Sequence, residues 1–484
     1  MTGRQPSEGE GQSSSGEFRY GRELADVDGK DEIGYDGGAE YGHDEHGYDS
    51  GLVTRRRFLA GLAVSGAVGY GAFWALGRPE ELATIDPTTT SRPPRTTGAA
   101  VTFPPSTTTT EAADELASNL LAPAPVDQRV LVLIELEGGN DGPSTVVPYG
   151  SGTYHDLRPT LAIPADQVLE LDDEIGLNPN LGRLYNRQMA VVEGVGPVDG
   201  SMSHFEMVAR WEQGDLSGTS GLRTGFLARL ADALDDGSPT IGLSVDGFTP
   251  RFNNVTASTL SLNHLNSLRV LTKDEWIFPA YREAVTSFSG GPMTTTLVES
   301  WRHLVEIGNA LPNEMTDIDE ESAMVQEGGH LGRQLAIAAE IIRADIGVRV
   351  VHARLSGFDT HKGHQYKQES LLQRVDMAVD GFLQQLTDSG MAERVLVATS
   401  SEFGRRAEEN ATGLDHGAAS TMLLFGPVRP GRYGAPSSFD DLDDRGNLKT
   451  MVPFDSYLGT LAEDWLGVEA ATVLPTTPEL LDIV

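Results

Sequence analysis

Side chains able to bind a metal or an anion gather in four short stretches, each following a run of apolar residues. The stretches read GGNDG, SMSHFE, GFDTHKGH and SEFGRRAEENATGLDHG. Their residues with the means for chemistry are Asn140, Asp141, Ser203, His204, Asp359, His361, His364, Glu402, Arg405, Asp415 and His416. Carboxylate oxygens and imidazole nitrogens are ligands for divalent cations such as zinc, manganese or calcium. The sequence therefore predicts a metal site assembled from separate parts of the chain.

Each stretch also has a purely structural interpretation. Gly-Gly and Asp-Gly pairs are typical of turns, and Ser203 is a suitable N-cap for a following helix. Glu402 and Arg405 could form a structural ion pair, and Asp359 could belong to a turn beside a hydrogen-bonded His361. The recurrence of such residues in four places favours one shared site over four unrelated features.

Short apolar runs predict the strands that must position these residues. The predicted strands are Arg129–Glu137, Met189–Val195, Arg349–Leu355, Arg394–Thr399 and Ser420–Phe425, and the predicted helices are Leu331–Ile346, Gln368–Leu386 and Tyr457–Leu466. Strands that alternate with amphipathic helices predict an α/β fold with a mostly parallel sheet, covered on both faces. Ligands bind at the carboxyl ends of the strands in such sheets. We therefore expect the polar stretches to converge there.

Composition limits the chemistry further. The chain of 484 residues has 36 Lys and Arg against 71 Asp and Glu, a formal net charge of −35, which excludes a nucleic-acid-binding protein with a broad basic surface. The hydrophobic content of 39% is enough for a folded core. Cysteine is absent, which excludes disulfides, thiolate metal sites and cysteine nucleophiles. Any catalysis must use Ser, His, carboxylates or a bound metal.

The first 127 residues differ in character from the rest. Residues 1–52 are acidic and rich in Gly and Ser, with few aliphatic side chains, which predicts disorder. Residues 78–127 are rich in Thr and Pro and predict an extended linker. The folded domain is expected over 128–484.

A basic and apolar segment, residues 53–77, separates these two regions. Arg55 and Arg56 precede Phe58 and an uncharged run over 59–76, a pattern that resembles a twin-arginine export signal. We therefore expect the twin-arginine translocase as a partner and a location outside the cytoplasm. A run of this length would rise about 27 Å as a helix, so permanent anchoring in the membrane is the alternative to cleavage.

Seven motifs, in order along the chain, resemble those of a known family. They are LIELEGGNDGPSTVVPY, YHDLRPTLAI, GLNPNLGRLY, VVEGVGPVDGSMSHF, GFDTHKGHQ, TSSEFGRRAEEN and LDHG. Together they look like the bacterial family named domain of unknown function 1501, over about Gln128 to Leu481. That family is related to the alkaline-phosphatase and sulfatase superfamily. The resemblance implies an alkaline-phosphatase-like three-layer α/β sandwich with a divalent-metal site that hydrolyses phosphate or sulfate esters.

The resemblance also implies roles for single residues. Ser203 stands where the superfamily has its nucleophile, at the start of a predicted helix over His204–Gln213. The positions that match metal or substrate ligands are Asp141, Asp359, His361, Glu402 and His416. The chain departs from the pattern at Phe403, which replaces a ligand His, at Asn178, where the family usually has His, and at His364, where it often has Gln. A formylglycine sulfatase is disfavoured, because its sequence pattern occurs only in the linker, at 91–95.

Two functions follow as hypotheses. The first is an exported hydrolase in which a cation activates Ser203 or a water molecule and Arg405 binds the anionic ester. The cation ligands would be Asp141, Asp359, His361 and Glu402, helped by Asp415 and His416, with Asn140, His204 and His364 as further candidates. The second is a non-catalytic surface protein that keeps the fold. Phe403 and the long linker favour it, whereas a serine at position 203 favours the enzyme.

Overall fold

The computed structural model describes residues 120–484, apart from 248, 254, 266–282, 284–291 and 313–316. The predicted disordered segment, the twin-arginine segment and nearly all of the Thr/Pro-rich linker lie outside the described residues. Within the described residues, no helix is both long enough and apolar enough to span a membrane.

Strand β1 (Val130–Glu137) has apolar side chains on both of its faces. Val130, Val132 and Ile134 belong to one hydrophobic core, whereas Leu131 and Leu133 belong to the other. Successive side chains of a strand point to opposite faces of a sheet, so this run of apolar residues can be buried only between two layers. β1 is therefore a central strand, as its composition predicts.

Within the described part of the chain, the central sheet has nine strands, in the order β11-β5-β10-β9-β1-β8-β6-β7, with β12 paired to β5. Its other strands are β5 (Met189–Gly196), β6 (Gly242–Ser244), β7 (Thr259–Ser261), β8 (Val350–Ser356), β9 (Val395–Ser400), β10 (Ser420–Phe425), β11 (Gly431–Tyr433) and β12 (Val452–Pro453). β10 is antiparallel to its neighbours β5 and β9, and the remaining pairings are parallel. The predicted α/β class with a mostly parallel central sheet is confirmed. A small separate sheet has the order β2-β4-β3, with β2 (Val146–Val147), β3 (Leu169–Glu170) and β4 (Gly176–Leu177).

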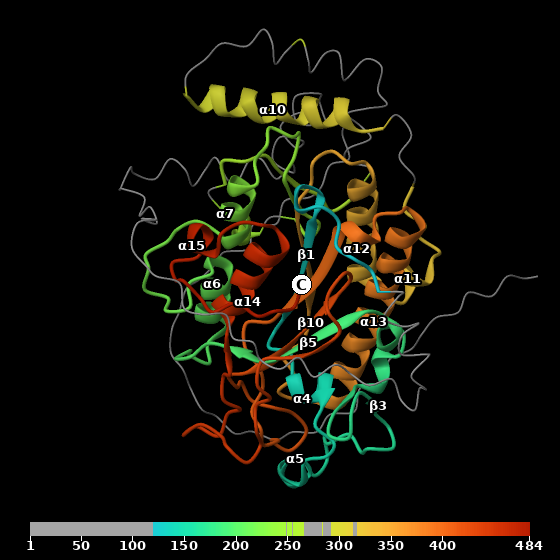
Figure 1. Ribbon diagram of the computed structural model, residues 1–484, viewed down its shortest axis with the longest axis vertical. Helices are drawn as coiled ribbons and strands as arrows, with labels where there is room; N and C mark the ends of the chain where they lie inside the picture. Colours follow the sequence, from blue (N-terminus) through green and yellow to red (C-terminus); the bar gives the residue numbers. More distant parts are fainter. Residues whose placement is uncertain (1–119, 248, 254, 266–282, 284–291, 313–316) are drawn as a thin grey trace, which may run out of the picture. The chain divides into compact units, whose positions relative to one another are not determined.

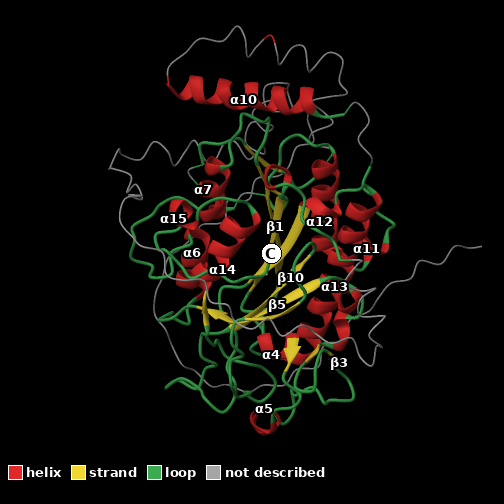
Figure 2. Cartoon of the chain, viewed as in Figure 1, coloured by secondary structure: helices red, strands yellow, loops and turns green. Residues whose placement is uncertain are grey.

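Helices cover both faces of the central sheet (Figures 1 and 2). One layer contains α11 (Ala323–Gln326), α12 (Gly329–Arg343) and α13 (His364–Asp388), and the other contains α6 (His204–Gln213), α7 (Phe226–Ala233), α14 (Phe454–Thr460) and α15 (Ala470–Val473). The other α-helices of the described residues are α4 (Gly142–Thr145), α5 (Gly152–Leu157) and α10 (Pro292–Ala310). Short 3-10 segments are η1 (Val126–Gln128), η2 (Pro179–Leu181), η3 (Leu184–Asn186), η4 (Pro250–Phe252) and η5 (Ala392–Arg394), and η6 (Leu461–Trp465) is a π-helical turn.

The predicted elements lie close to the observed ones, and the differences concern helix ends. α13 starts four residues before the predicted helix, because Gly363 adopts a left-handed conformation (φ 64°) that allows the preceding loop to turn into the helix at His364. The predicted helix over 457–466 is divided between α14 and the π-helical turn η6. The helix predicted over His204–Gln213 has these same bounds in the structure.

The order and direction of the strands bring all four polar stretches to one edge of the sheet, because β5 runs in the same direction as β9 across the antiparallel β10. β1 is paired in parallel with β8 on one side and with β9 on the other. Their carboxyl ends therefore meet at the same edge, where the loops that begin at Gly138, Gly357 and Ser401 leave the sheet. The first residue of α6 approaches this edge from the neighbouring layer.

Candidate metal centre

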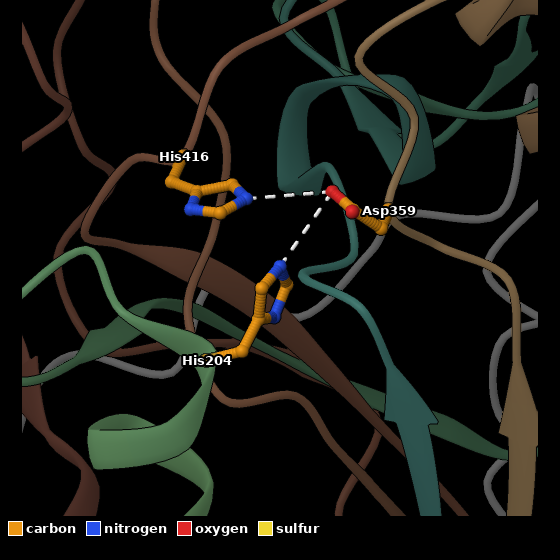
Figure 3. A group of neighbouring side chains, drawn as sticks. All are labelled: His204, Asp359 and His416. Atoms are coloured by element: carbon orange, nitrogen blue, oxygen red, sulfur yellow. Dashed lines mark hydrogen bonds and ion pairs between the residues drawn. The ribbon is translucent and has the colours of Figure 1, made fainter. Parts of the chain in front are cut away.

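His204, Asp359 and His416 come together at this edge from three different segments (Figure 3). Asp359 lies in the loop after β8, His204 is the first residue of α6, and His416 precedes β10. Asp359 Oδ1 is 3.6 Å from Nε2 of His204 and 3.4 Å from Nε2 of His416. The rings approach the carboxylate from two sides, each with Nε2 foremost.

A third imidazole approaches the same carboxylate oxygen. His361 Nε2 lies 3.2 Å from Asp359 Oδ1 and 2.9 Å from Nε2 of His416. Ligands in a tetrahedral zinc site lie about 2.0–2.2 Å from the ion, which places them roughly 3.3 Å from one another. The separations between these imidazole and carboxylate atoms are close to that value. The ligand atoms of His204, Asp359 and His416 all lie within 4.8 Å of one another and suit a small divalent cation, and His361 is a neighbour of this group.

The other ring nitrogen of each imidazole faces a group that can only accept a hydrogen bond at neutral pH. Nδ1 of His204 donates to Glu402 Oε1 at 2.9 Å, and Nδ1 of His361 donates to Asp415 Oδ1 at 3.1 Å. Nδ1 of His416 donates to the carbonyl oxygen of Met202 at 2.7 Å. A neutral imidazole carries only one proton, so these bonds leave Nε2 of each ring as a bare lone pair. This is the tautomer that binds a metal through Nε2.

One of these Nε2 atoms, that of His204, is left unsatisfied. Nε2 of His204 is buried and has no hydrogen-bond partner within the part of the chain that the structure describes. Nitrogen lone pairs directed at a carboxylate oxygen repel it unless a positive charge lies between them. A cation bound by His204, His416 and Asp359, with His361 beside it, would satisfy these atoms together. The residues present therefore fit a metal ion.

Glu402 lies behind His204. Its carboxylate is buried, and besides His204 it accepts a hydrogen bond from the backbone N–H of Gly138 at 2.8 Å. The bond with Glu402 raises the pKa of His204, although burial of the ring acts in the opposite direction. A direct metal ligand was expected at this position. These contacts favour a residue that orients a ligand instead.

Arg405 is completely buried and forms hydrogen bonds with the loops around the site. Its guanidinium donates to the carbonyl oxygens of Gly139, Leu414, Phe358 and Gly138 and to Asp359 Oδ1, the last at 2.8 Å. Burial alone would raise the pKa of Asp359, but the hydrogen bond and charge of Arg405 outweigh it and lower that pKa to about 2. With these donors occupied and no exposed surface, Arg405 is unsuited to the expected role of binding a substrate anion.

Two glycines allow the loop after β1 to pass close to the other loops. Gly138 has a φ of 116°, and a Cβ at this position would lie 2.3 Å from the backbone nitrogen of Asp359. Gly139 has a φ of 84°, and its Cβ would lie 2.6 Å from the ring of Phe403. Larger residues would therefore displace the segment that carries Asp359.

Asp141 does not join this group. It is fully buried and pairs with Arg158 through two contacts, at 2.5 and 3.0 Å. Arg158 also donates to the carbonyl oxygens of Arg406 and Ala407. The expected ligand Asp141 is thus part of a buried ion pair between loops, because the guanidinium occupies both of its carboxylate oxygens.

The further candidates Asn140 and His364 belong to the same buried region as Asp141. His364 contacts Ser144 and Thr360 at 3.1 and 2.7 Å, and its Nε2 is 3.6 Å from Asp141. Asn140 accepts hydrogen bonds from Thr145 and Gln368 through its side-chain oxygen. Their contacts join loops and α13 and do not extend to Asp359.

Ser203 occupies the N-cap position of α6, immediately before His204. Its side chain is exposed and makes no capping hydrogen bond, so the structure does not show the N-cap that the sequence suggested.

Asp415, expected as a secondary ligand, instead accepts a hydrogen bond from Nδ1 of His361 and a further one from Asn410.

Sequence reasoning gave His204 too small a role and missed Phe403 as a packing residue. The Phe403 ring lies 4.8 Å from the His204 ring and 4.6 Å from the His416 ring, measured between centroids. It fills the space beneath two of the imidazoles. The sequence signal for His204 as a ligand was its position directly after Ser203 in SMSHFE. The functional role predicted for this motif was assigned to the serine instead.

Comparison with known proteins gives a family and a set of distant structural similarities. The family model described as "Protein of unknown function (DUF1501)" matches residues 199–445, just over half of the chain. None of the curated proteins compared with the chain is similar to it in sequence.

Three solved structures illustrate the structural similarities. PsFucS1 sulfatase from Pseudoalteromonas sp. has 10% identity over 74% of this chain and 70% of its own, with a TM-score of 0.32. The C-terminal periplasmic domain of EcEptC from Escherichia coli, in complex with Zn, has 10% identity over 70% of this chain and 82% of its own, with a TM-score of 0.32. Alkaline phosphatase from the Antarctic bacterium TAB5 has 12% identity over 63% of this chain and 92% of its own, with a TM-score of 0.26. With every score below 0.5, functional reasoning rests on the residues of this chain.

Proposed function

The chain belongs to the family described as Protein of unknown function (DUF1501), and we propose that it is an exported, metal-dependent hydrolase of phosphate or sulfate esters. The observation that carries the proposal is the arrangement of three imidazole Nε2 atoms around Asp359 Oδ1, each ring held by a hydrogen bond at Nδ1. A zinc or manganese ion is the cation that best suits a set of imidazoles and one carboxylate.

The accessibility of the centre supports a catalytic role. Side chains of Asp359 and His361 are nearly half exposed, whereas Glu402 and Arg405 beneath them are buried. A buried frame thus holds ligands that face solvent, and an ester in solution can approach them. Structural metal sites, by contrast, are usually closed by protein ligands.

The chain supplies two further features for the reaction. A cation at the centre would polarise the ester and make a bound oxygen nucleophile more acidic. Ser203 precedes the ligand His204 and is exposed, so its hydroxyl is a candidate for that nucleophile, with water as the alternative. The first-turn N–H groups of the ten-residue helix α6 lie at the same place and favour an anion.

Arg405 provides the observation that favours a second candidate function, a non-catalytic surface protein. Its guanidinium is enclosed by carbonyl groups and Asp359. It therefore leaves no free charge for a substrate anion. A protein of this kind would keep the cation as a structural or binding element without turnover.

Hydrolysis by Ser203 variants tests the proposal. Wild-type protein loaded with Zn²⁺ or Mn²⁺ is assayed on an aryl phosphate and an aryl sulfate, beside Ser203→Ala and the neighbouring Ser201→Ala. If Ser203 is the nucleophile, Ser203→Ala lowers kcat at least about a hundredfold with unchanged metal content. Equal activity of Ser203→Ala and wild type assigns the attack to water. Absence of wild-type turnover on both esters, with metal bound, supports the surface protein.

Export by the twin-arginine pathway is part of the proposal. Its support is the Arg55-Arg56 pair before Phe58 and the uncharged run over 59–76. A protein that acquires a metal benefits from folding before it crosses the membrane. Replacing Arg55 and Arg56 with Lys should retain the protein in the cytoplasm, and unchanged export of that variant would point to another signal or to an anchor.

A further inference from the structure

A second group of ionisable residues surrounds a small cavity of about 30 Å³ on the α6 side of β1 and β8. Its wall includes Glu135 and Glu137 of β1, His352 and Arg354 of β8, Glu212 of α6 and Asp246. A water molecule needs about 10–15 Å³ of such space. The cavity therefore has room for about two to three waters, or for a small ion with one or two waters. None of these residues contributes a ligand atom to the centre around Asp359.

His352, which lines this cavity, has one ring nitrogen that is not satisfied. The ring is almost fully buried, and its Nε2 donates to Glu135 Oε2 at 3.1 Å. This bond leaves Nδ1 with the lone pair of a neutral ring, and among the described residues Nδ1 has no hydrogen-bond partner. A buried nitrogen without a partner is costly. A ligand in the cavity would satisfy it.

Glu212 is the second group without a partner. Among the described residues, its carboxylate forms no hydrogen bond and no ion pair, although the other acids of the cavity wall are all paired. Glu135 forms an ion pair with Arg251. Glu137 and Asp246 both form ion pairs with Arg354. Burial is the main reason why the pKa of Glu212 is raised, to about 7. A cation beside Glu212 would remove this cost.

The carboxylates around the cavity outnumber the guanidinium groups that pair with them. Glu135, Glu137, Glu212 and Asp246 line the cavity, their guanidinium partners are Arg251 and Arg354, and Asp246 also contacts His330. A cation beside Glu212 would offset the carboxylate that has no guanidinium partner among the described residues. A nitrogen ligand with a carboxylate suits manganese or zinc better than magnesium or calcium.

We propose that this cavity is a second divalent-cation site, with His352 Nδ1 and the Glu212 carboxylate as protein ligands and water completing the coordination. Glu135 fixes the His352 ring in the tautomer that binds through Nδ1. The carboxylate of Glu212, which no other described side chain contacts through a hydrogen bond or ion pair, moves onto the ion. This site is independent of the ester hydrolysis proposed above.

Mn²⁺ binding to a protein that lacks the first centre tests the proposal. The full chain with His204→Ala and His416→Ala is freed of metal and titrated with Mn²⁺, and free Mn²⁺ is followed by electron paramagnetic resonance. Glu212→Gln is then added to this background. Glu206→Gln serves as the matched control, because it removes the same charge from an exposed position of the same helix. Circular dichroism melting confirms that each protein is folded.

The expected result is one saturable Mn²⁺ equivalent in the double variant. Glu212→Gln should weaken its binding at least tenfold, and Glu206→Gln less than twofold. Absence of Mn²⁺ binding in the folded double variant overturns the proposal and assigns the cavity to water and a protonated Glu212. Equal affinity with and without Glu212→Gln also overturns it. The Mn²⁺ titrations test this second site whether or not the protein hydrolyses esters.

Discussion

The Glu402 carboxylate lies 2.9 Å from Nδ1 of His204, joining the loop after β9 to the first residue of α6. The same oxygen accepts the backbone N–H of Gly138 at the end of β1. One buried side chain thus fixes a strand end and the direction of an imidazole. The position of His204 Nε2 beside Asp359 depends on this bond.

Replacing Glu402 should therefore weaken metal binding without removing a ligand. In Glu402→Ala, Nδ1 of His204 loses its acceptor, and the ring loses both its orientation and part of its basicity. Changes of this kind typically cost ten- to a hundredfold in metal affinity. Competition with a chromophoric chelator measures the effect. Glu408→Ala, an exposed acid of the same loop, is the control, and equal losses in the two variants would contradict the orienting role.

Metal affinity should also depend on pH in a defined direction. A protonated imidazole cannot bind a cation, so protons and metal compete for His204 and its neighbours. The bond with Glu402 raises the pKa of His204 above its ordinary value, whereas burial lowers the pKa of His416, so protons compete with the metal for these two rings over different pH ranges. We expect affinity to fall steadily as the pH is lowered from 8 to 5, measured by the same chelator assay. Constant affinity over this range would exclude imidazole ligands.

The elements that carry the site were predictable because local patterns determine them. Apolar runs such as Arg129–Glu137 can be buried only as central strands, and the period of His204–Gln213 is that of a helix. The convergence of Asp359, His361 and His416 followed from the rule that parallel strands deliver ligands at their carboxyl ends.

The pairing of individual side chains was not predictable from these patterns. Asp141 lies at a strand end like the other acids, but its carboxylate is bound by the guanidinium of Arg158, seventeen positions later in the chain. Likewise, whether Ser203 or His204 points at Asp359 depends on the rotation of α6 about its axis, which packing of Met207 and Trp211 in the core determines. Such contacts depend on the assembled fold, and no local signal reports them.

Arg405 should be essential for stability. Arg405→Lys keeps the charge but cannot reach four carbonyl groups and Asp359 at once, because an ammonium is compact and lacks the planar fork. Leaving such buried groups unsatisfied should cost about 3–5 kcal/mol of the free energy of unfolding. Urea denaturation measures this cost. Arg406→Lys, whose side chain donates to one carbonyl group, should cost under about 1 kcal/mol, and similar losses in both would contradict the structural role of Arg405.

The ion pair between Asp141 and Arg158 predicts a stability difference that depends on pH. Burial alone would raise the pKa of Asp141, but Arg158 and a hydrogen bond with His364 lower it far below its ordinary value. The stabilisation is then fully present above the unfolded-state pKa of about 3.9 and is lost as the pH falls below it. Asp141→Asn leaves a buried guanidinium unpaired and should cost about 3–5 kcal/mol.

Urea denaturation of wild type and Asp141→Asn at pH 7, 5 and 3.5 checks this prediction. The difference in the free energy of unfolding should be the same at pH 7 and 5 and smaller at pH 3.5. Metal content should remain unchanged in any folded sample of the variant. Loss of metal from folded Asp141→Asn would return Asp141 to the ligand set.

Metal content of the purified protein tests the central claim most directly. Wild type and the Asp359→Ala, His416→Ala variant are saturated with Zn²⁺, passed through a desalting column and measured by inductively coupled plasma mass spectrometry, with circular dichroism to show that both are folded. The account predicts that the variant holds one equivalent less than wild type. Equal zinc content in the two folded proteins would contradict a metal centre at Asp359.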